Sequence, residues 1–339
     1  MKARAIAFAL CVAVFAGTAV GYTAYALHRD KAAVAAGERV HPRRGAVEPA
    51  ADGPPRLVFR DTAKGPGFGK LASVPLADPQ GPRKVDTRAC ERSYTAAGRL
   101  LCLAGSGGLI VHHYAEVYDA AGHLLTKEKL PGLPSRARLS PDGRMAAWTA
   151  FVYGDSYTSV GFSTRTAILD TRTGSYVPSL EEFTTYRDGK VFAPTDRNFW
   201  GVSFLADDTT FYATLGSVSH GGTYLVRGDV RTRTATVLTT NVECPSLSPD
   251  GTRLAFKKKI SADPARPWRL YVLDLATMRE TALADTRSVD DQADWLDNRT
   301  IAYALPDGTS TFDLYRQPAD GTGRPTLLAR GAASPSVVR

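Results

Sequence analysis

Histidines and paired carboxylates are the side chains of this sequence whose types and spacing could support catalysis or ligand binding. His112 and His113 are adjacent, so in a strand they point to opposite faces, and a metal site there would need distant partners. His220 lies in a Ser- and Gly-containing segment that can line a binding site, although a plain surface histidine is the alternative. Asp290 and Asp291 could form a carboxylate pair for acid–base work or cation binding. The alternative is a polar loop whose aspartates cap backbone amides.

Sequence motifs for nucleophilic or cofactor chemistry are absent from the chain. There is no G-x-S-x-G elbow, no H-E-x-x-H pair, no Walker loop and no C-x-x-C pair. We therefore expect no catalytic residues of a known type, no cofactor and no bound metal.

The charge of the chain does not indicate a nucleic-acid partner. The net charge is +8, but basic and acidic residues alternate along nearly the whole sequence, and the one dense basic run is Lys257 to Lys259. A basic stripe interleaved with aromatic residues, which is typical of nucleic-acid binding, is missing. We expect a solvated charged surface and no nucleic-acid partner.

The N-terminus predicts export. Lys2 and Arg4 precede an apolar stretch from Ala5 to Leu27, which is long enough to cross a bilayer as a helix. Basic residues in front keep that end in the cytoplasm, so the rest of the chain is expected outside. Residues 1–27 are therefore expected to be a signal anchor in the cytoplasmic membrane. The alternative is a signal peptide cleaved after Ala24 to Ala26, which would give a secreted protein.

Two further segments are expected after this stretch. Residues 28–54 are rich in Ala, Pro, Gly and charge without a sustained period, which predicts a linker. Residues 55–339 are expected to form the folded domain. Cys90 and Cys102 flank a predicted hairpin turn at residues 96–98, so a disulfide between opposite strands is possible in an extracytoplasmic protein.

A repeated unit organises residues 55–339. Its clearest copies are Leu139–Trp148 and Leu247–Phe256, each with Ser-Pro-Asp-Gly before a short apolar run. Proline fixes φ at the turn, aspartate caps it and glycine accepts a positive φ, so each unit predicts strand, tight turn and strand. Each copy continues into a third strand that ends in an acidic turn, such as Leu270 to Asp274, and then a fourth.

Weaker copies complete the pattern. Measured at turn positions 97, 142, 207, 250 and 297, the spacings are 45, 65, 43 and 47 residues, so the 65 indicates an insertion. Four strands in about 45 residues are the size of a propeller blade. The segment from Arg56 lacks a first strand, and the last residues, Ser334 to Arg339, look like a first strand with nothing after it. Joining the two ends predicts a closed, all-β propeller of six four-stranded blades.

The repeat resembles that of TolB-type six-bladed propellers. The resemblance rests on the Ser-Pro-Asp-Gly units and on the Tyr-x-x-Asp strand that follows them. In addition, segments 198–202, 242–250 and 288–292 are similar to membrane-linked, TolB-like bacterial proteins of unsettled function. The resemblance covers roughly residues 56–339, specifies the fold, and implies no catalytic residues. TolB acts in an envelope protein complex and has an additional N-terminal domain, whereas this chain has an apolar stretch, so that role is not carried over.

Propeller topology indicates where ligands should bind. Loops between strands two and three and connections from strand four to the next blade share one face, and here the longest of them lie in the middle of the chain. For the two tryptophans of this set, core packing is the alternative to ligand contact. The candidate ligand-binding residues are Tyr153, Tyr157, Trp200 and Trp268 for stacking, Lys257, Arg266 and Arg287 for anions, and His220, Asp290, Asp291 and Gln292 for polar contacts.

These observations favour a non-catalytic propeller outside the cell membrane that binds a protein or cell-envelope ligand through its loop-rich face. The alternative is a propeller enzyme, a hydrolase or lyase, with its site at the channel mouth, because propellers also support such chemistry. Convergence of His220, Asp290 and Asp291 within hydrogen-bond distance would favour the enzyme.

Overall fold

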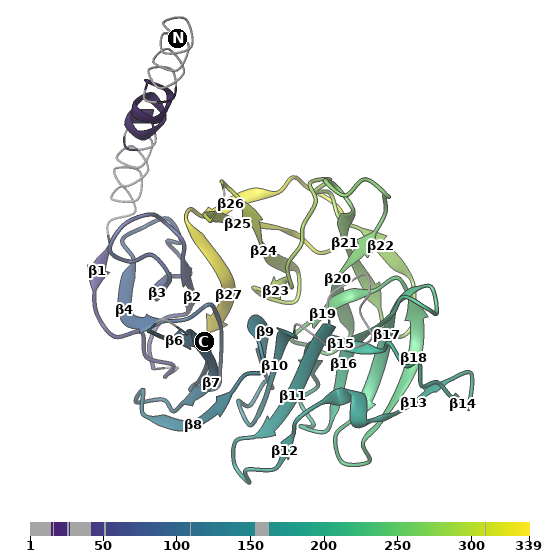
Figure 1. The fold of residues 1–339 in the computed structure, drawn as a ribbon. Coiled ribbons are helices and arrows are strands. Elements are labelled where there is room, and N and C mark those ends of the chain that lie inside the picture. The colour runs from purple at the N-terminus through teal and green to yellow at the C-terminus, as the bar shows by residue number, and fades with distance from the viewer. Residues whose placement is uncertain are drawn as a thin grey trace, which may run out of the picture.

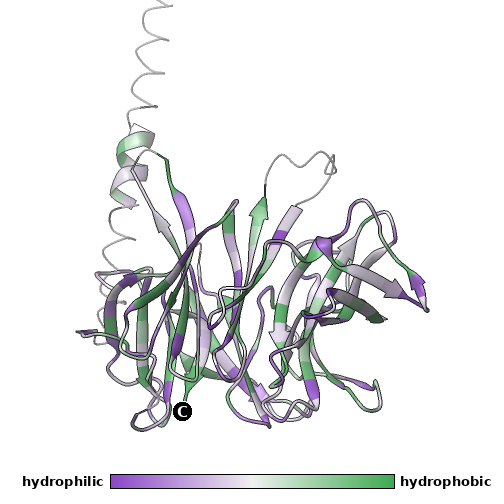
Figure 2. Ribbon diagram, turned by 90° about the horizontal axis from the view of Figure 1, so that it is seen from below, coloured by the Kyte–Doolittle hydropathy of each residue, from purple (hydrophilic) through white to green (hydrophobic). Residues whose placement is uncertain are grey.

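Six sheets surround a common axis in the computed structural model, which describes residues 15, 17–25, 27, 42–50, 52–108, 110–152, 163–308 and 310–339 (Figure 1). Within each sheet the four repeat-derived strands pair in an antiparallel manner, and we number the sheets as blades 1 to 6 in chain order. The predicted six-bladed all-β propeller with four-stranded blades is confirmed. Hydrophobic residues lie along the strands of the blades in the side view of Figure 2.

The strands of the first three blades, with the short edge strand β1, are β1 (Arg43–Arg44), β2 (Arg56–Asp61), β3 (Lys70–Pro75), β4 (Lys84–Ala89), β5 (Arg92–Ala96), β6 (Arg99–Ser106), β7 (His112–Tyr118), β8 (Leu124–Lys129), β9 (Leu133–Leu139), β10 (Met145–Val152), β11 (Ser163–Asp170) and β12 (Tyr176–Val177). The remaining elements are η1 (Leu180–Glu182), β13 (Thr184–Arg187), β14 (Lys190–Val191), β15 (Asn198–Phe204), β16 (Thr210–Ser217), β17 (Gly222–Asp229), β18 (Thr234–Thr240), β19 (Glu243–Leu247), β20 (Arg253–Lys259), β21 (Trp268–Asp274), β22 (Glu280–Ala282), β23 (Asp294–Trp295), β24 (Thr300–Pro306), β25 (Phe312–Pro318), β26 (Thr326–Ala329) and β27 (Ala332–Val338).

The Ser-Pro-Asp-Gly turns form the same hydrogen bonds in both clear copies. In blade 3, the Ser140 hydroxyl donates to Asp142 at 2.5 Å, and Asp142 accepts the Arg144 amide at 2.9 Å. In blade 5, Ser248 donates to Asp250 at 2.6 Å in the same way. The glycines have φ of 76° and 70°, a left-handed conformation that only glycine adopts without strain. These turns connect the first and second strands of each blade.

The long spacing between the second and third turns corresponds to an inserted hairpin. The connection from blade 3 to blade 4 contains η1, and then β13 and β14. β13 pairs with β18 in parallel, so the hairpin extends the outer edge of blade 4 to six strands. The insertion therefore covers an edge that would otherwise expose unpaired backbone groups.

The two ends of the domain meet in blade 1. β27 is the innermost strand of this blade and pairs with β2 in antiparallel register, from Arg56 opposite Val338 to Asp61 opposite Ala332 (Figure 1). The predicted closure of the ring by the C-terminal strand is confirmed. Arg83 reinforces it, since its guanidinium contacts Asp61 at 3.0 Å and donates to the Gly331 carbonyl at 3.1 Å.

The hydrophobic core is divided among the blade interfaces. One buried cluster lies between each pair of neighbouring blades, including the pair formed by blades 6 and 1. Between blades 3 and 4, for example, Ile168 packs with Phe199 and Phe211. Each blade has to bury both faces, so the blades depend on one another for stability.

Part of the expected linker packs against blade 1. β1 pairs in parallel with β4, and the buried Val47 amide donates to Asp86 at 2.7 Å. Arg88 donates to the Val47 carbonyl at 2.7 Å and pairs with Asp86 at 2.5 Å. We call residues 42–50 the strap. Its pairing covers the outer edge of β4, so backbone groups there are not left unpaired. Composition alone does not reveal this pairing.

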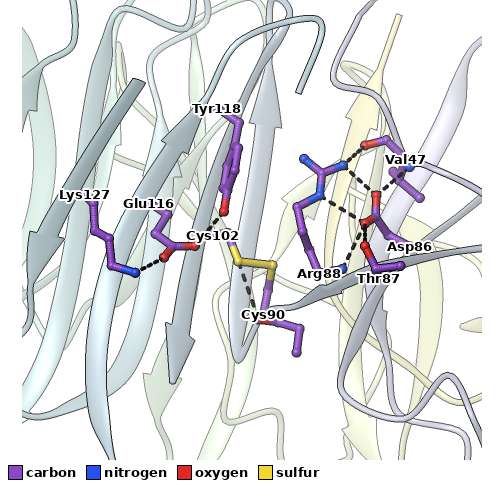
Figure 3. Close-up of a disulfide and its surroundings, with 10 residues drawn as sticks. Val47, Asp86, Thr87, Arg88, Cys90, Cys102, Glu116, Tyr118 and Lys127 are labelled. Atoms are coloured by element: carbon purple, nitrogen blue, oxygen red, sulfur yellow. Dashed lines mark hydrogen bonds and ion pairs between the residues drawn. A yellow bond between two sulfur atoms is a disulfide. The ribbon is translucent and has the colours of Figure 1, made fainter. Parts of the chain in front are cut away.

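A disulfide joins Cys90 and Cys102, with their Cα atoms 5.3 Å apart (Figure 3). Cys90 lies in the connection from blade 1 to blade 2, and Cys102 lies in β6. The bridge belongs to the same buried cluster as Val47 and Val338. For a loop of this size, the chain-entropy model gives a stabilisation of about 3 kcal/mol.

The described residues between 15 and 27 are helical. Among these described residues, no helix has the length and apolar character needed to cross a membrane. Residues 5–14, 16 and 26 of the expected span lie outside the described residues.

Candidate functional site

The first strand of each blade lines the central axis, and a buried network joins these strands across it. Arg138 in β9 contacts Asp294 in β23 at 2.7 Å, which links blades 3 and 6 on opposite sides of the ring. The Tyr94 hydroxyl in β5 donates to Asp294 at 3.1 Å, and the centre of the Tyr94 ring lies 4.3 Å from the Arg138 guanidinium carbon. Burial, together with the negative charge of Asp294, raises the pKa of Tyr94 to about 12. The network occupies the middle of the channel.

Gln292 and Trp295 extend this network toward blades 4 and 5. The buried Gln292 amide donates to the Pro245 carbonyl at 2.7 Å and approaches the Val202 carbonyl at 3.3 Å. The Trp295 indole N–H donates to the Ser246 carbonyl at 2.8 Å. The channel is therefore filled by residues that hold the blades together.

A cavity of about 1190 Å³ opens on the loop-rich face. Its lining comes from blades 2 to 5 and from the connection that precedes blade 6. Arg92 in β5 and Arg136 in β9 line the cavity. They precede Tyr94 and Arg138 of the buried network by two positions, so the cavity lies one pleat above this network. The lining combines aromatic residues with five cationic and three acidic side chains, and the charged ones are Arg92, Arg136, Arg187, Lys257, Lys259, Asp196, Glu243 and Asp290.

Five of the predicted binding residues line this cavity: Trp200, His220, Lys257, Trp268 and Asp290. Lys257, from β20, is the centre of one group. Its ammonium lies 3.5 Å from the Glu243 carboxylate, pairs with Asp290, and sits 4.3 Å from the centre of the Trp268 ring. Burial raises the pKa of Glu243, and Lys257 only partly offsets this effect.

Trp200 contributes mainly to packing. Its side chain is 8% exposed, and its six-membered ring lies against Gly216, where a Cβ atom would come within 2.6 Å of the ring. Glycine at position 216 is therefore required for this contact. Trp268 is partly exposed and offers more surface to a ligand.

The other predicted residues lie elsewhere. Arg287 pairs with Asp285 at 2.7 Å and stacks on Tyr315, away from the cavity lining. Arg266 is exposed in the β20–β21 loop and is not among the lining residues. Asp291 approaches Arg136 at 3.7 Å, and Gln292 belongs to the buried network described above. Tyr153 and Tyr157 lie outside the described residues.

His220 belongs to a hydrogen-bonded group at the rim. Its Nδ1 atom lies 2.9 Å from the Ser219 hydroxyl and 3.3 Å from the Ser217 hydroxyl. Both hydroxyls donate to Asp196 at 2.7 Å, as does the Ser219 amide at 2.8 Å. Burial acts to raise the pKa of Asp196, but these three hydrogen bonds outweigh it and lower the pKa to about 2.

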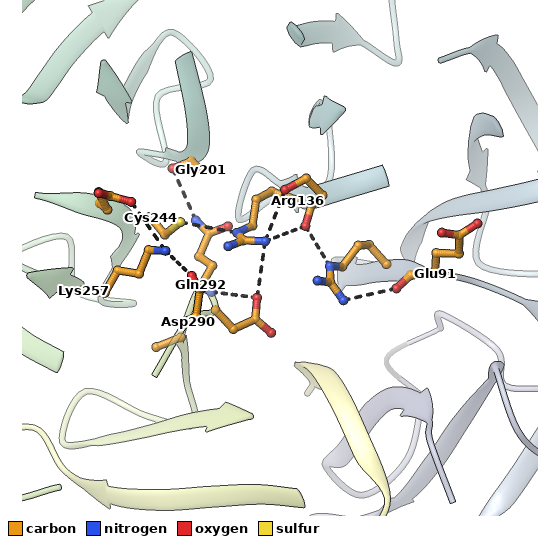
Figure 4. Close-up of polar contacts among 12 residues, drawn as sticks. Glu91, Arg136, Gly201, Cys244, Lys257, Asp290 and Gln292 are labelled. Atoms are coloured by element: carbon orange, nitrogen blue, oxygen red, sulfur yellow. Dashed lines mark hydrogen bonds and ion pairs between the residues drawn. The ribbon is translucent and has the colours of Figure 1, made fainter. Parts of the chain in front are cut away.

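Sequence reasoning did not select two arginines of the cavity lining, Arg92 and Arg136, of which Arg136 is labelled beside Lys257 and Asp290 in Figure 4. Arg92 begins β5, and Arg136 lies in β9, so each occupies the upper part of an innermost strand. Only the register of these strands brings together residues that are 44 positions apart. The rim residue Asp196 was also missed, because nothing in its local sequence marks it.

The histidine pair of β7 shows no metal site. His113 lies 3.0 Å from the Glu91 carboxylate, whereas His112 is exposed at the opposite face of the strand. In the part of the chain that the structure describes, no group of three His, Cys, Asp or Glu side chains could hold a metal ion.

The fold defines this chain as a six-bladed β-propeller, and comparison with solved structures identifies its type. TolB from Acinetobacter baumannii is similar over 84% of this chain and 66% of its own, with a TM-score of 0.58 at 18% identity. At this identity the likeness concerns the fold alone, so the propeller of this chain is similar to the propeller of TolB. No family model and no curated protein matches the sequence.

Two weaker likenesses carry no argument about function. A putative TolB from Agrobacterium tumefaciens gives a TM-score of 0.48 at 13% identity, over 83% of this chain and 91% of its own. A puromycin-hydrolyzing peptidase from Mycobacterium tuberculosis gives 0.48 at 14% identity, over 82% of this chain and 44% of its own.

Proposed function

We propose that this chain is a non-catalytic binding propeller that engages a protein or a cell-envelope ligand through its loop-rich face. The observation that carries the proposal is the cavity on this face, which several blades line jointly. A site of this form suits a ligand group that enters from one side. Concave sites formed between rigid elements are where proteins most often bind ligands.

The rim of the cavity supports the same proposal. Val218, in the β16–β17 loop, is 82% exposed, and Ile260, at the end of β20, is 50% exposed. Both lie on strand two-to-three loops, which share the loop-rich face. Exposed aliphatic side chains beside a cavity favour contact with a large partner.

An extracytoplasmic location completes the proposal. The Cys90–Cys102 disulfide suits an oxidising compartment. The apolar stretch at residues 5–27 supports a signal anchor with the propeller outside the cytoplasmic membrane, and cleavage of this stretch would give a secreted form.

The enzyme alternative, a hydrolase or lyase at the channel mouth, has the His220 group in its favour. In a catalytic triad the carboxylate orients the histidine and the histidine takes the serine proton. Here the carboxylate of Asp196 accepts both serine hydroxyls, so the serines lie between the carboxylate and the imidazole. Asp290 and Asp291 contact Lys257 and Arg136 instead of His220. This arrangement favours binding over catalysis.

Site-specific photo-crosslinking in intact cells that make the full chain tests the proposal. A photoreactive residue at Val218 should capture a partner or envelope component, and the same residue at Met278, an exposed apolar position beyond β21, should not. Capture at Val218 should weaken in an Asp290→Ala variant. Equal labelling at the two positions would contradict a loop-face site.

A parallel assay addresses the enzyme alternative. Hydrolysis of a small activated ester is measured with the chain and with His220→Ala and Ser219→Ala variants. Turnover that is lost in both variants would establish the alternative.

A further inference from the structure

Two arginines converge on one carbonyl at the cavity wall. The Arg92 Nε atom donates to the Ser135 carbonyl at 2.7 Å, and the Arg136 Nη1 atom donates to the same oxygen at 2.9 Å (Figure 4). Both guanidinium groups are partly withdrawn from water. Like charges this close repel each other, and the repulsion strengthens as water is excluded.

The negative charge near this pair acts mainly on Arg136: burial alone would lower its pKa, but Cys244, Asp291 and Asp290 outweigh burial and raise the pKa. Arg136 has Asp291 at 3.7 Å, and its Nε atom contacts the Cys244 sulfur at 3.4 Å. Among the described residues, Arg92 has no carboxylate within 4 Å. Its remaining hydrogen bond goes to the Glu91 main chain at 3.5 Å.

Neighbouring acids already contact other side chains. Glu243 and Asp290 both contact Lys257, and the Glu91 carboxylate contacts His113. Asp196, the third acidic lining residue, accepts hydrogen bonds from two serines. None of the three acids of the lining makes an ion pair with Arg92 within 4 Å, although Asp290 and Arg92 attract each other at longer range.

A third guanidinium enlarges the positive region. Arg60, in β2, has a buried Nε atom with no hydrogen-bond partner among the described residues. The pKa of Arg60 is lowered, first by burial and then by the positive charge of Arg92. Arg60 is not among the residues that line the cavity, but its positive charge adds to that of Arg92.

We propose that Arg92 and Arg136 bind an acidic group, a carboxylate or a phosphate, of the ligand that enters the cavity. This inference rests on the binding function proposed above and gives the ligand a chemical class. The guanidinium groups are held in place by Ser135, so they are oriented before a ligand arrives. Arginine binds carboxylate and phosphate through parallel hydrogen bonds, and prior orientation lowers the cost of binding.

Thermal unfolding of the full chain with matched sugars tests the inference. Glucuronate supplies a carboxylate, glucose 6-phosphate supplies a phosphate, and glucose is the uncharged reference, all at constant ionic strength. We expect at least one acidic sugar to raise Tm with concentration, and glucose to have no effect. The response to the two acids distinguishes a carboxylate ligand from a phosphate ligand.

Three variants assign the effect to the site. Arg92→Gln and Arg136→Gln should each weaken the apparent affinity roughly tenfold, because each removes a charged hydrogen-bond donor. Arg287→Gln is the matched control, since Arg287 lies on the same face but is paired with Asp285. Without sugar, the first two variants should melt at the same temperature as the parent or higher, because a repulsion is relieved.

Specific outcomes would overturn the inference. Equal Tm responses to glucose and to both acids would do so, as would an acid response that survives in an Arg92→Gln/Arg136→Gln double variant. A lower Tm of both variants without sugar would show that the arginines are structural. If Val218 crosslinking persists under any of these results, the binding function stands and only the acidic ligand class fails.

Discussion

At the scale of single residues, the direction of hydrogen bonds at Asp196 decides what the rim group can do. The carboxylate accepts two hydroxyls and one amide, which fixes the Ser217–His220 loop at the cavity edge. An acceptor with three donors is stabilised in its charged form. The group is therefore a charged structural support for the loop, and the His220 ring packs edge-to-face against Phe192 at 5.2 Å between ring centres.

The low pKa of Asp196 predicts an acid-dependent loss of stability. Its folded-state pKa of about 2 lies below the value of an unfolded aspartate, so its stabilising effect is complete above about pH 4 and is lost as pH falls toward 2. Asp196→Asn should therefore lose less Tm than the parent between pH 5 and pH 2. Parallel acid titrations of Tm measure this difference. Identical curves would show that Asp196 has an ordinary pKa.

The buried pair Arg138–Asp294 predicts a larger effect on stability. Asp294→Ala leaves the Arg138 charge buried without its partner, which should cost about 3–5 kcal/mol of unfolding free energy. Glu280→Ala, which breaks a more exposed pair with Lys258, should cost less than about 1 kcal/mol. Urea unfolding followed by tryptophan fluorescence measures both. Similar losses in the two variants would contradict a network role for Asp294.

Residue types alone could predict only part of the cavity. Lys257, Trp268 and Asp290 were recognisable because they lie in long loops or at strand ends near them. Arg287 was indistinguishable from them in sequence, yet it forms an ion pair with Asp285, two positions earlier. Arg92 escaped notice because a single arginine at the start of a strand has no distinguishing pattern.

At the scale of elements, the Ser-Pro-Asp-Gly turn is where sequence determines structure most directly. Most of its hydrogen bonds are local, so proline, aspartate and glycine largely specify it, and in blade 5 the Asp250 amide also donates to the Asn298 side chain at 3.1 Å. The strap shows the opposite case. Its composition resembles a linker, and it becomes ordered because β4 offers an unpaired edge and Asp86 an acceptor. Neither feature is visible in residues 42–50 themselves.

The turn of blade 5 provides a test at this scale. Asp250 accepts the Ser248 hydroxyl and the Thr252 amide and hydroxyl, so Asp250→Ala should lower the unfolding free energy by about 1–2 kcal/mol. Asp52→Ala, at an exposed position before β2, is the control and should change it by less than about 0.5 kcal/mol. Chemical denaturation compares the two. A neutral Asp250→Ala would show that proline and glycine suffice for the turn.

At the scale of the whole molecule, stability depends on closing the ring. Every buried cluster lies between two blades, so each blade is stable only when both of its neighbours are in place. The interface of blades 6 and 1 is the last to be connected along the chain. It is held by β27, by its cluster with β2, and by Arg83. A defect at this position should therefore weaken all six blades together.

Arg83 allows this dependence to be measured. Its buried guanidinium pairs with Asp61 and donates to the Gly331 and Arg330 carbonyls, which belong to the connection into β27. Arg83→Met leaves the Asp61 carboxylate buried without its charged partner, so it should lower the unfolding free energy by about 3–5 kcal/mol. Adding Asp61→Asn should restore part of the lost unfolding free energy, because the unpaired charge is removed.

Arg330→Met, at an exposed position, is the control. If unfolding remains cooperative in every variant and the loss appears in all probes at once, the ring behaves as a single unit. A loss confined to blade 1 would mean that the blades unfold separately.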